Sequence, residues 1–286
     1  CHIAVEKYRR MQAAKAAESQ PVPPPPPPGP AEPPAQTELP PSAGPLPPPV
    51  HHALVTDEED REPINFREHL PRVFHYPFSG VGPWVMGATI SFLIVASFIP
   101  FAGFFLTIVG YGYFCAYCFR VVTTTADSPD DPAPWPGMEN PGSGLILPII
   151  KIAWAGIASY LPAGLYLFFI SPIGPMDPVF WLLMLAGAVY APMGLLAVVM
   201  SGNFLALNPF VVVPAILRTF KDYIFCLIAM VVVMVMRGLF ESILKVPIPI
   251  LGSAIQWFIT LYFLTVEMRI LGLLYAANEE ELGWYT

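Results

Sequence analysis

Charged residues are scarce in this chain, and many of them lie near its start. Only 12% of the 286 residues are Asp, Glu, Lys or Arg, about half the share found in an ordinary soluble domain. Half of the 14 Lys and Arg residues come before position 80, as do ten of the 21 acidic residues. The rest of the chain is too apolar for an ordinary aqueous surface, which predicts a lipid-embedded body behind a hydrated N-terminal arm.

Clusters of basic residues are also missing. The formal net charge is −7 at pH 7, and Lys and Arg nowhere gather into a patch. Binding to nucleic acid normally needs such a patch, so the composition excludes nucleic acid as a partner. The expected partners are the lipid bilayer and other proteins of a membrane complex.

Reactive side chains are few and poorly placed for catalysis. All five histidines lie before position 80, ahead of the apolar stretches, so this chain alone cannot ligate a haem between membrane helices. No Gly-rich phosphate loop, Gly-x-Ser-x-Gly elbow or His-Glu-x-x-His motif occurs. The sequence therefore predicts a protein that is not an enzyme and has no cofactor or metal site.

The four cysteines give no disulfide framework. Cys115 and Cys118 have the Cys-x-x-Cys spacing of redox and zinc sites, but they lie in an apolar, aromatic run without a nearby histidine. We expect buried structural thiols there and at Cys226. The chain opens on Cys1-His2, and three interpretations stay open: a lipidated cysteine, the remnant of a haem or zinc motif, or an arbitrary chain start.

Proline is in large excess ahead of the apolar region. Residues 21–50 hold 16 of the 36 prolines, and six of these form a continuous run: Pro23, Pro24, Pro25, Pro26, Pro27 and Pro28. Proline fixes φ and lacks an amide donor, so residues 21–62 are predicted to form an extended, acidic arm. The arm is either a spacer of about 3 Å per residue or a docking strip for a partner's aromatic-lined groove. Residues 1–20 are rich in helix formers and predict a short polar helix.

A juxtamembrane segment, residues 63–80, follows the arm. Its apolar residues recur at helical spacing with charged residues between them: Phe66, Leu70, Val73 and Phe74, with Arg67, Glu68 and Arg72. This pattern predicts a helix that lies in the membrane interface with its basic residues near the headgroups. Tyr76, Phe78 and Trp84 predict an aromatic belt where the chain enters the membrane.

Residues 81–286 form the predicted transmembrane domain. Six apolar stretches of about 20 residues are long enough, at 1.5 Å per residue, for a hydrocarbon core of about 30 Å. They are residues 83–99, 102–121, 145–170, 178–200, 222–243 and 249–276. The first two are joined by a very short connection, and it stays open whether both cross or the pair is re-entrant. The predicted fold is all-α, a polytopic bundle of six transmembrane helices.

A second surface helix is predicted between the fourth and fifth stretches. Asn208 is a suitable N-cap ahead of Pro209, and Arg218 and Lys221 close the last turn. The positions of Lys and Arg near the stretch ends favour an orientation with both termini inside. The predicted inner side holds Arg67, Arg72, Arg120, Lys151, Arg218, Lys221 and Arg269, and the outer side holds Lys245 and Arg237.

Ionisable residues within the apolar stretches are candidate functional residues, because charge at membrane depth is costly. Arg237 and Glu241 are four residues apart on one helix face and can pair. Glu267 can pair near Arg269 or with a basic residue of another helix. Snorkelling or mutual neutralisation explains these charges without a chemical role. Interfacial or structural roles are expected for Arg72, Trp84, Arg218, Lys221, Arg237, Glu241 and Arg269.

Several short patterns occur together in the last three quarters of the chain. They are residues 75–82 (HYPFSGVG), Gly110-Tyr111, Arg120, residues 124–126, Asn208-Pro209, residues 269–275 (RILGLLY) and Leu282-Gly283-Trp284. As a set they resemble a family of bacterial multi-pass membrane proteins described only as a domain of unknown function. The resemblance implies a multi-pass protein of the bacterial cytoplasmic (inner) membrane and implies no activity. Members of this kind often have a zinc ribbon ahead of the membrane region, of which Cys1-His2 would be a remnant.

We therefore predict a non-catalytic integral membrane subunit with a structural, scaffold or assembly role, whose Pro-rich arm docks a partner in a larger membrane complex. Two alternatives stay open. Pro162 and Pro192 interrupt the third and fourth stretches, as in a small-molecule or lipid transporter. A membrane thiol redox protein would instead use Cys115 and Cys118.

Overall fold

The structure is a computed structural model that describes residues 66–137, 142–171, 174–244 and 248–284. The chain divides into two units, residues 1–62 and 63–286, and all of the described residues belong to the second. The predicted polar helix of residues 1–20, the arm of residues 21–62, Cys1-His2 and the proline run Pro23–Pro28 lie outside the described residues. Those predictions stay predictions.

The described part of the chain consists of helices and their connections, without a strand. The long helices are α3 (Gly82–Ser97), α4 (Ala102–Asp127), α5 (Leu147–Phe169), α6 (Pro178–Ser201), α8 (Phe220–Ile243) and α9 (Pro249–Ala277). The short ones are α2 (Phe66–His69), η1 (Leu70–Phe74), η2 (Tyr76–Phe78), the π-turn η3 (Gly142–Ile146), η4 (Gly174–Met176), η5 (Phe204–Leu207), α7 (Pro209–Arg218) and α10 (Glu279–Leu282). The prediction of an all-α polytopic bundle is confirmed.

About six spans are predicted, and the structure has one fewer helix that is both long and apolar enough to be a span. Within the described residues, five helical segments are both long and apolar enough to cross a membrane: residues 102–127, 144–169, 178–201, 220–243 and 250–277. The sixth candidate, α3, has only 16 residues, about 24 Å of helix against a hydrocarbon core of about 30 Å. Its apolar run was read from the sequence as residues 83–99, but the helix already ends at Ser97, where the chain turns back into α4.

Side-chain caps fix where two of the later helices begin. Asp177 accepts a hydrogen bond from the Val179 amide at 3.0 Å ahead of α6, and Asn208 accepts one from the Phe210 amide at 3.0 Å ahead of α7. The Asn208 cap is the one predicted from the sequence. Helix α7 ends at Arg218, however, so Lys221 lies in the first turn of α8 and not in the last turn of the surface helix.

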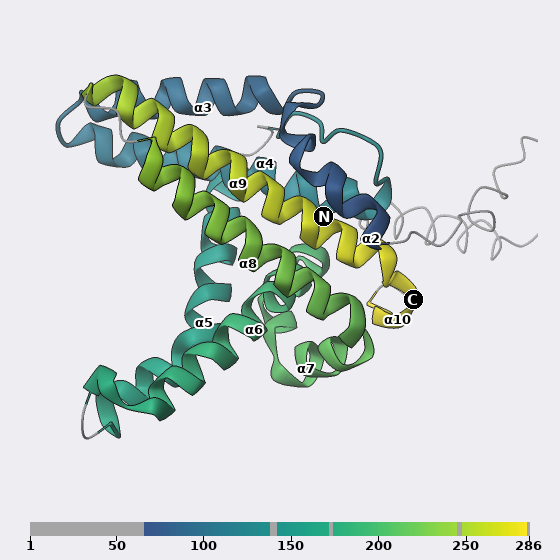
Figure 1. The fold of residues 1–286 in the computed structure, drawn as a ribbon. Coiled ribbons are helices and arrows are strands. Elements are labelled where there is room, and N and C mark those ends of the chain that lie inside the picture. Colours follow the sequence, from purple (N-terminus) through teal and green to yellow (C-terminus); the bar gives the residue numbers. More distant parts are fainter. Residues whose placement is uncertain (1–65, 138–141, 172–173, 245–247, 285–286) are drawn as a thin grey trace, which may run out of the picture. The chain divides into compact units, whose positions relative to one another are not determined.

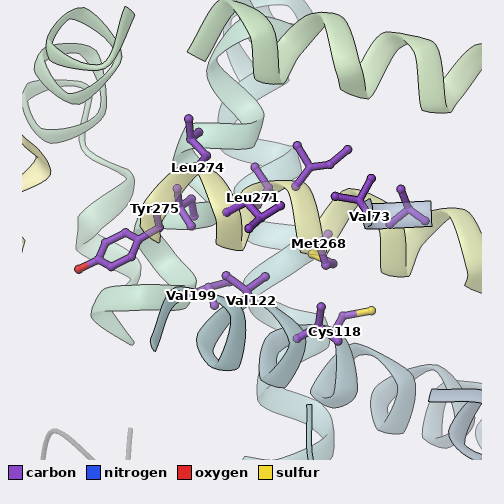
Figure 2. Close-up of a cluster of buried hydrophobic side chains, with 14 of the residues drawn as sticks. Val73, Cys118, Val122, Val199, Met268, Leu271, Leu274 and Tyr275 are labelled. Atoms are coloured by element: carbon purple, nitrogen blue, oxygen red, sulfur yellow. The ribbon is translucent and has the colours of Figure 1, made fainter. Parts of the chain in front are cut away.

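Helix α9 forms the interior of the unit. In its apolar stretch 67% of the residues are buried, against 17% in α8, so α9 is surrounded by protein whereas α8 lies at the periphery. Helix α9 packs against α4, α3 and α8, and these four helices lie alongside one another in Figure 1. The buried cluster in Figure 2 joins α9 to α4, α6 and η1 through residues that include Val73, Cys118, Val122, Val199, Met268, Leu271, Leu274 and Tyr275.

Glycines set the closest helix contacts. A Cβ atom at Gly272 of α9 would lie 2.6 Å from the Thr125 Cβ atom of α4. In the hairpin of α5 and α6, a Cβ atom at Gly187 would lie 2.6 Å from the Ser159 carbonyl oxygen. Membrane helices gain most of their association energy from close packing, because lipid is as apolar as their side chains. These two positions therefore decide how tightly the helix pairs pack.

The segment before α3 is packed onto the bundle. It forms three short helical turns, α2, η1 and η2, and not the single interfacial helix that its spacing predicted, because Pro71 and Pro77 interrupt the hydrogen bonding. Phe66 and Val73 are buried, and all three turns contact α9. The apolar side of this segment is therefore covered by protein, at least in part.

Candidate functional site

Arg269 makes the most extensive set of polar contacts among the charged residues of the described spans. It lies in α9 and is 7% exposed. Its Nη1 atom donates to the Thr125 hydroxyl of α4 at 2.7 Å, and its Nη2 atom donates to the Pro129 carbonyl oxygen in the loop after α4. Its guanidinium also lies 4.1 Å from the centre of the Tyr76 ring. One side chain thus joins α9, α4, the loop after α4 and η2, and we call these four residues the arginine clamp.

Tyr76 is the residue of the arginine clamp that lies in the segment before α3. Its hydroxyl accepts a hydrogen bond from the Ala133 amide at 2.9 Å. Burial raises the pKa of this hydroxyl above its ordinary value, so the phenol is neutral at physiological pH. Arg269 therefore meets a neutral aromatic face in a cation–π contact, and not a phenolate in an ion pair.

Two further contacts fix the pre-membrane segment. The Tyr262 hydroxyl of α9 donates to the Phe74 carbonyl oxygen at 2.7 Å. The Arg67 guanidinium lies 3.9 Å from the centre of the Phe225 ring of α8. Contacts to α8 and α9 thus hold the chain just before it enters α3.

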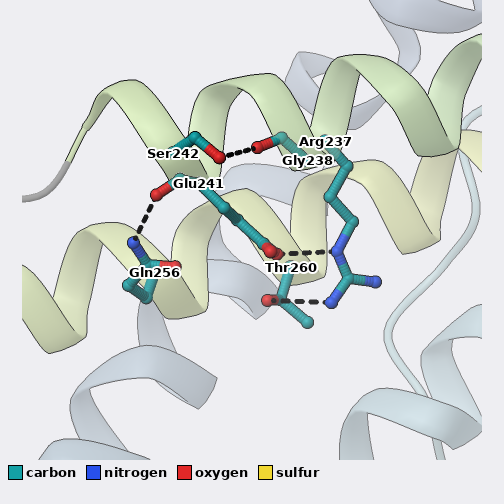
Figure 3. A network of polar contacts seen from close by, with 6 residues as sticks. All are labelled: Arg237, Gly238, Glu241, Ser242, Gln256 and Thr260. Atoms are coloured by element: carbon teal, nitrogen blue, oxygen red, sulfur yellow. Dashed lines mark hydrogen bonds and ion pairs between the residues drawn. The ribbon is translucent and has the colours of Figure 1, made fainter.

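Arg237 and Glu241 form the ion pair that their spacing allowed, one helical turn apart on α8 (Figure 3). The Arg237 Nε atom lies 2.8 Å from a Glu241 carboxylate oxygen. Two longer contacts of 3.4 Å reach α9, from Arg237 Nη2 to the Thr260 hydroxyl and from Gln256 Nε2 to the Glu241 carbonyl oxygen. Both charged side chains are about one third exposed, so this network is a peripheral link between α8 and α9.

Glu267 interacts electrostatically with Arg237 of α8, a basic residue of another helix, and not with Arg269. The neighbouring Arg269 is committed to Thr125 and Pro129, because residues two apart on a helix point to different faces. Within the part of the chain that the structure describes, Glu267 makes no hydrogen bond or ion pair. It is a half-buried acid near the middle of the most buried span, and such residues are functional candidates by default.

The cysteines of the described spans are all buried free thiols. Cys115 and Cys118 lie one turn apart on α4, and Cys226 lies on α8. Cys118 has no exposed surface and belongs to the buried cluster. A reaction at the Cys118 thiol would therefore need the packing of this cluster to open first.

The turn between α5 and α6 contains a separate cluster of hydrogen bonds centred on Asp177. Asp177 accepts hydrogen bonds from the Tyr166 hydroxyl at 2.7 Å and the Ser171 hydroxyl at 3.2 Å, besides its cap contact to Val179. The hydrogen bond from Tyr166, followed by that from the Val179 amide, holds the pKa of the Asp177 carboxyl below its ordinary value. These three hydrogen bonds use most of the carboxylate's acceptor positions and lock the turn.

The other predicted site residues are scattered. Arg72, Arg218 and Lys221 are exposed on η1, α7 and α8, and Trp84 is 73% exposed near the start of α3. The exposure of Trp84 suits the predicted aromatic belt, whereas Tyr76 is buried in the arginine clamp and does not belong to that belt. The structure does not bring the four together.

Sequence reasoning missed the partners of the arginine clamp. Thr125 and Arg269 are 144 residues apart in the chain, and no local pattern signals a contact over that distance. Tyr76 gave a weak signal, since it stands between charged and apolar segments, but that signal pointed to the membrane interface.

The described residues contain no group of three His, Cys, Asp or Glu side chains that could hold a metal ion. Comparison of the chain with protein-family models, curated proteins and solved structures gives no match.

Proposed function

We propose that this chain is a non-catalytic integral membrane subunit with a structural or assembly role. In this proposal the transmembrane bundle anchors the Pro-rich arm, and the arm docks a partner protein of a larger membrane complex. The arginine clamp carries the proposal. The one cation of α9, Arg269, is used to fix the segment that follows the arm in sequence, and not to line a reaction centre.

An anchored arm has a mechanical use that a loosely attached one lacks. The described residues that follow the arm are fixed to α8 and α9 by Arg67, Tyr76 and the Tyr262 contact to Phe74. A pull on the arm by a docked partner would therefore act on the core of the bundle. Polyproline segments suit docking, because their preformed conformation loses little entropy on binding.

The membrane and orientation are part of the same proposal. We place the chain in the cytoplasmic (inner) membrane of a bacterium with both termini in the cytoplasm, an orientation in which the short helix α3 crosses the membrane together with the five longer helices. Support comes from the excess of Lys and Arg near one set of predicted span ends, since cytoplasmic loops carry that excess.

The docking role is tested by exchanging prolines in the full chain. One variant replaces Pro23–Pro28 by alternating Gly and Ser, and a matched control replaces six other prolines of the arm, Pro33, Pro34, Pro40, Pro41, Pro47 and Pro48, in the same way. Both are expressed in their native membrane, cross-linked, and purified in mild detergent. We expect a defined partner with the wild type and the control, and its loss with the first variant.

Three outcomes contradict this proposal. The wild type runs as a monodisperse monomer without any cross-linked partner, or both proline variants retain the partner equally. A partner lost from both variants alike shows that the arm acts through its length and stiffness, which contradicts a specific docking strip at residues 23–28.

A transporter is the second candidate, and Glu267 is the observation that favours it. An acid without a hydrogen bond or ion pair among the described residues, near the middle of a span, is typical of proton and cation pathways. In proteoliposomes with an internal pH dye, a transporter should lose proton-coupled flux in Glu267→Gln and keep it in Glu281→Gln, an exposed acid of α10. Absence of flux in the wild type contradicts this candidate.

A further inference from the structure

Lys151 is a buried cation inside a span. It lies in the apolar segment of residues 144–169 and is 7% exposed. It belongs to the buried stripe of α5, whose other members are small or apolar: Pro148, Ala155, Ser159 and Ala163. Lysine is rarely buried to this extent unless it is paired.

Lys151 has no counter-ion on the elements that pack against α5. Those elements are α4, α6, η3, η4 and η5. They contribute two acids, Asp127 at the last position of α4 and Asp177 beside η4, and Asp177 is already taken by Tyr166, Ser171 and Val179. Among the described residues, no hydrogen bond or ion pair reaches Lys151.

A second cation lies beside the same segment. The Arg120 Nη2 atom of α4 is 3.8 Å from the position that a Cβ atom would have at Gly137. The Gly137 carbonyl oxygen is in turn 3.5 Å from the position that a Cβ atom would have at Gly144. Gly144 begins the helical segment that reaches Lys151 about two turns later. Arg120 is exposed, and its side chain likewise makes no ion pair or hydrogen bond with the described part of the chain.

The crossing of α4 and α5 is flanked by lipid-like surface. A Cβ atom at Gly112 of α4 would lie 2.6 Å from the Leu145 carbonyl oxygen, so the two segments touch there. From this point the exposed side of η3 and α5 is apolar: Ile146 of η3 and Ile150, Trp154 and Ile157 of α5 are each about half exposed. Lys151 and Arg120, neither of which has an ion pair among the described residues, thus lie next to a surface that suits acyl chains.

We propose that the crossing of α4 and α5 binds the phosphate headgroup of an anionic phospholipid, with Lys151 and Arg120 as its cationic residues. A cation inside an apolar span without a counter-ion is costly, and a phosphate group offsets that cost. Basic sites between membrane helices bind anionic headgroups in this way. The lipid tails lie along Ile150, Trp154 and Ile157. This inference does not rest on the subunit role proposed above.

The test compares lipids on the purified full chain. Phosphatidylglycerol, phosphatidylcholine and inorganic phosphate are each added to the protein in detergent, and binding is followed by thermal shift and native mass spectrometry. We expect stabilisation by phosphatidylglycerol alone. Its affinity should fall about five- to tenfold in Lys151→Met and in Arg120→Gln, be kept in Lys151→Arg, and be unchanged in the exposed control Arg218→Gln.

Folding of the variant supplies an independent readout. In phosphatidylcholine, Lys151→Met should unfold at the same temperature as the wild type or a higher one, because a charge without a counter-ion has been removed from an apolar span. Three results overturn the proposal: equal binding of phosphatidylglycerol by wild type and Lys151→Met, stabilisation by inorganic phosphate as large as by the lipid, or easier unfolding of Lys151→Met in phosphatidylcholine.

Discussion

Single charged residues in this protein mainly hold separate segments of the chain together. Arg269 joins α9 to Thr125 and Pro129, and Asp177 gathers Tyr166 and Ser171 at a turn. Each is a charged group in a largely apolar chain, and each is buried with its hydrogen bonds made. Because a buried charge is tolerated only with partners, such residues specify one arrangement of the segments they contact.

Replacing Arg269 by Met should loosen the pre-membrane segment. The change removes two charge-assisted hydrogen bonds and the contact with the Tyr76 ring, so we expect a loss of about 2 to 4 kcal/mol in the free energy of unfolding. Proteolysis at residues 66–78 should become faster. Chemical denaturation in detergent and limited proteolysis measure the two effects.

Arg218→Met is the matched control for this change, since Arg218 is exposed on α7. It should alter the free energy of unfolding by less than about 0.5 kcal/mol. Equal effects of the two substitutions would show that the arginine clamp contributes nothing particular to stability.

Asp177 should make the turn between α5 and α6 sensitive to acid. Its pKa is held below the ordinary value by the Tyr166 and Val179 contacts, so the carboxylate stabilises the fold above the unfolded-state pKa of about 3.9. That contribution is lost as pH falls through the lower pKa of the folded state. Exchange of the Val179 amide with deuterium should therefore be slow from pH 7 to about pH 5 and lose its protection below about pH 4.

The variant Asp177→Asn removes the titrating group but keeps an oxygen acceptor for the cap. Its Val179 protection should be weaker than in the wild type at pH 7 and flat across the same range, once intrinsic exchange rates are divided out. An acid transition of the same size in both proteins would assign it to another group.

At the scale of elements, helix pairs are spaced by small residues. The sequence makes α5 and α6 a hairpin through Pro172, Pro175 and Pro178 between two apolar stretches, but it does not say how closely the helices pack. Gly187 decides that, because a side chain there would collide with the Ser159 carbonyl and the Tyr160 ring. Gly164 in the same hairpin has no atom within 4 Å of its added Cβ position.

The substitution Gly187→Ala should separate α5 from α6 and cost about 1 to 3 kcal/mol, as expected for overpacking. Gly164→Ala should be neutral or stabilising by up to about 1 kcal/mol, because alanine is the better helix former. The two changes add the same methyl group to the same hairpin, so thermal unfolding of the pair isolates the contact. Identical melting temperatures would contradict this close approach.

At the scale of the whole membrane unit, the helix ends fall into two sets, one at each end of α4. Helix α3 begins beside Tyr117 and ends beside Gly103 of α4, so it runs antiparallel to α4 along most of that helix. The arginine clamp joins η2, the end of α4 and the C-terminal half of α9. The turn after Ser97 therefore lies at the opposite end of α4 from the pre-membrane segment.

Cysteine labelling can test on which side of the membrane each set of helix ends lies. In a background where Cys1 is Ser, single cysteines at Arg72 and Glu281 should react with a membrane-impermeant maleimide from one side of oriented vesicles. A cysteine at Ser97 should react only from the other side. Reaction of all three from one side would show that α3 and α4 form a re-entrant pair that does not cross.

The sequence by itself determined the class of this protein and most of its helices. Long apolar stretches force a membrane-embedded helical fold, because lipid offers no partner for backbone polar groups, and Asn208 with Pro209 placed the start of α7 because capping is local. Only the tertiary structure decided which residues the charged side chains contact. The contacts of Arg269 with Tyr76, Thr125 and Pro129 depend on segments up to 193 residues apart meeting in space, and hydrophobic periodicity holds no information about such meetings. The length of α3 was decided in the same way, since a helix end set by a tertiary turn leaves little local signal.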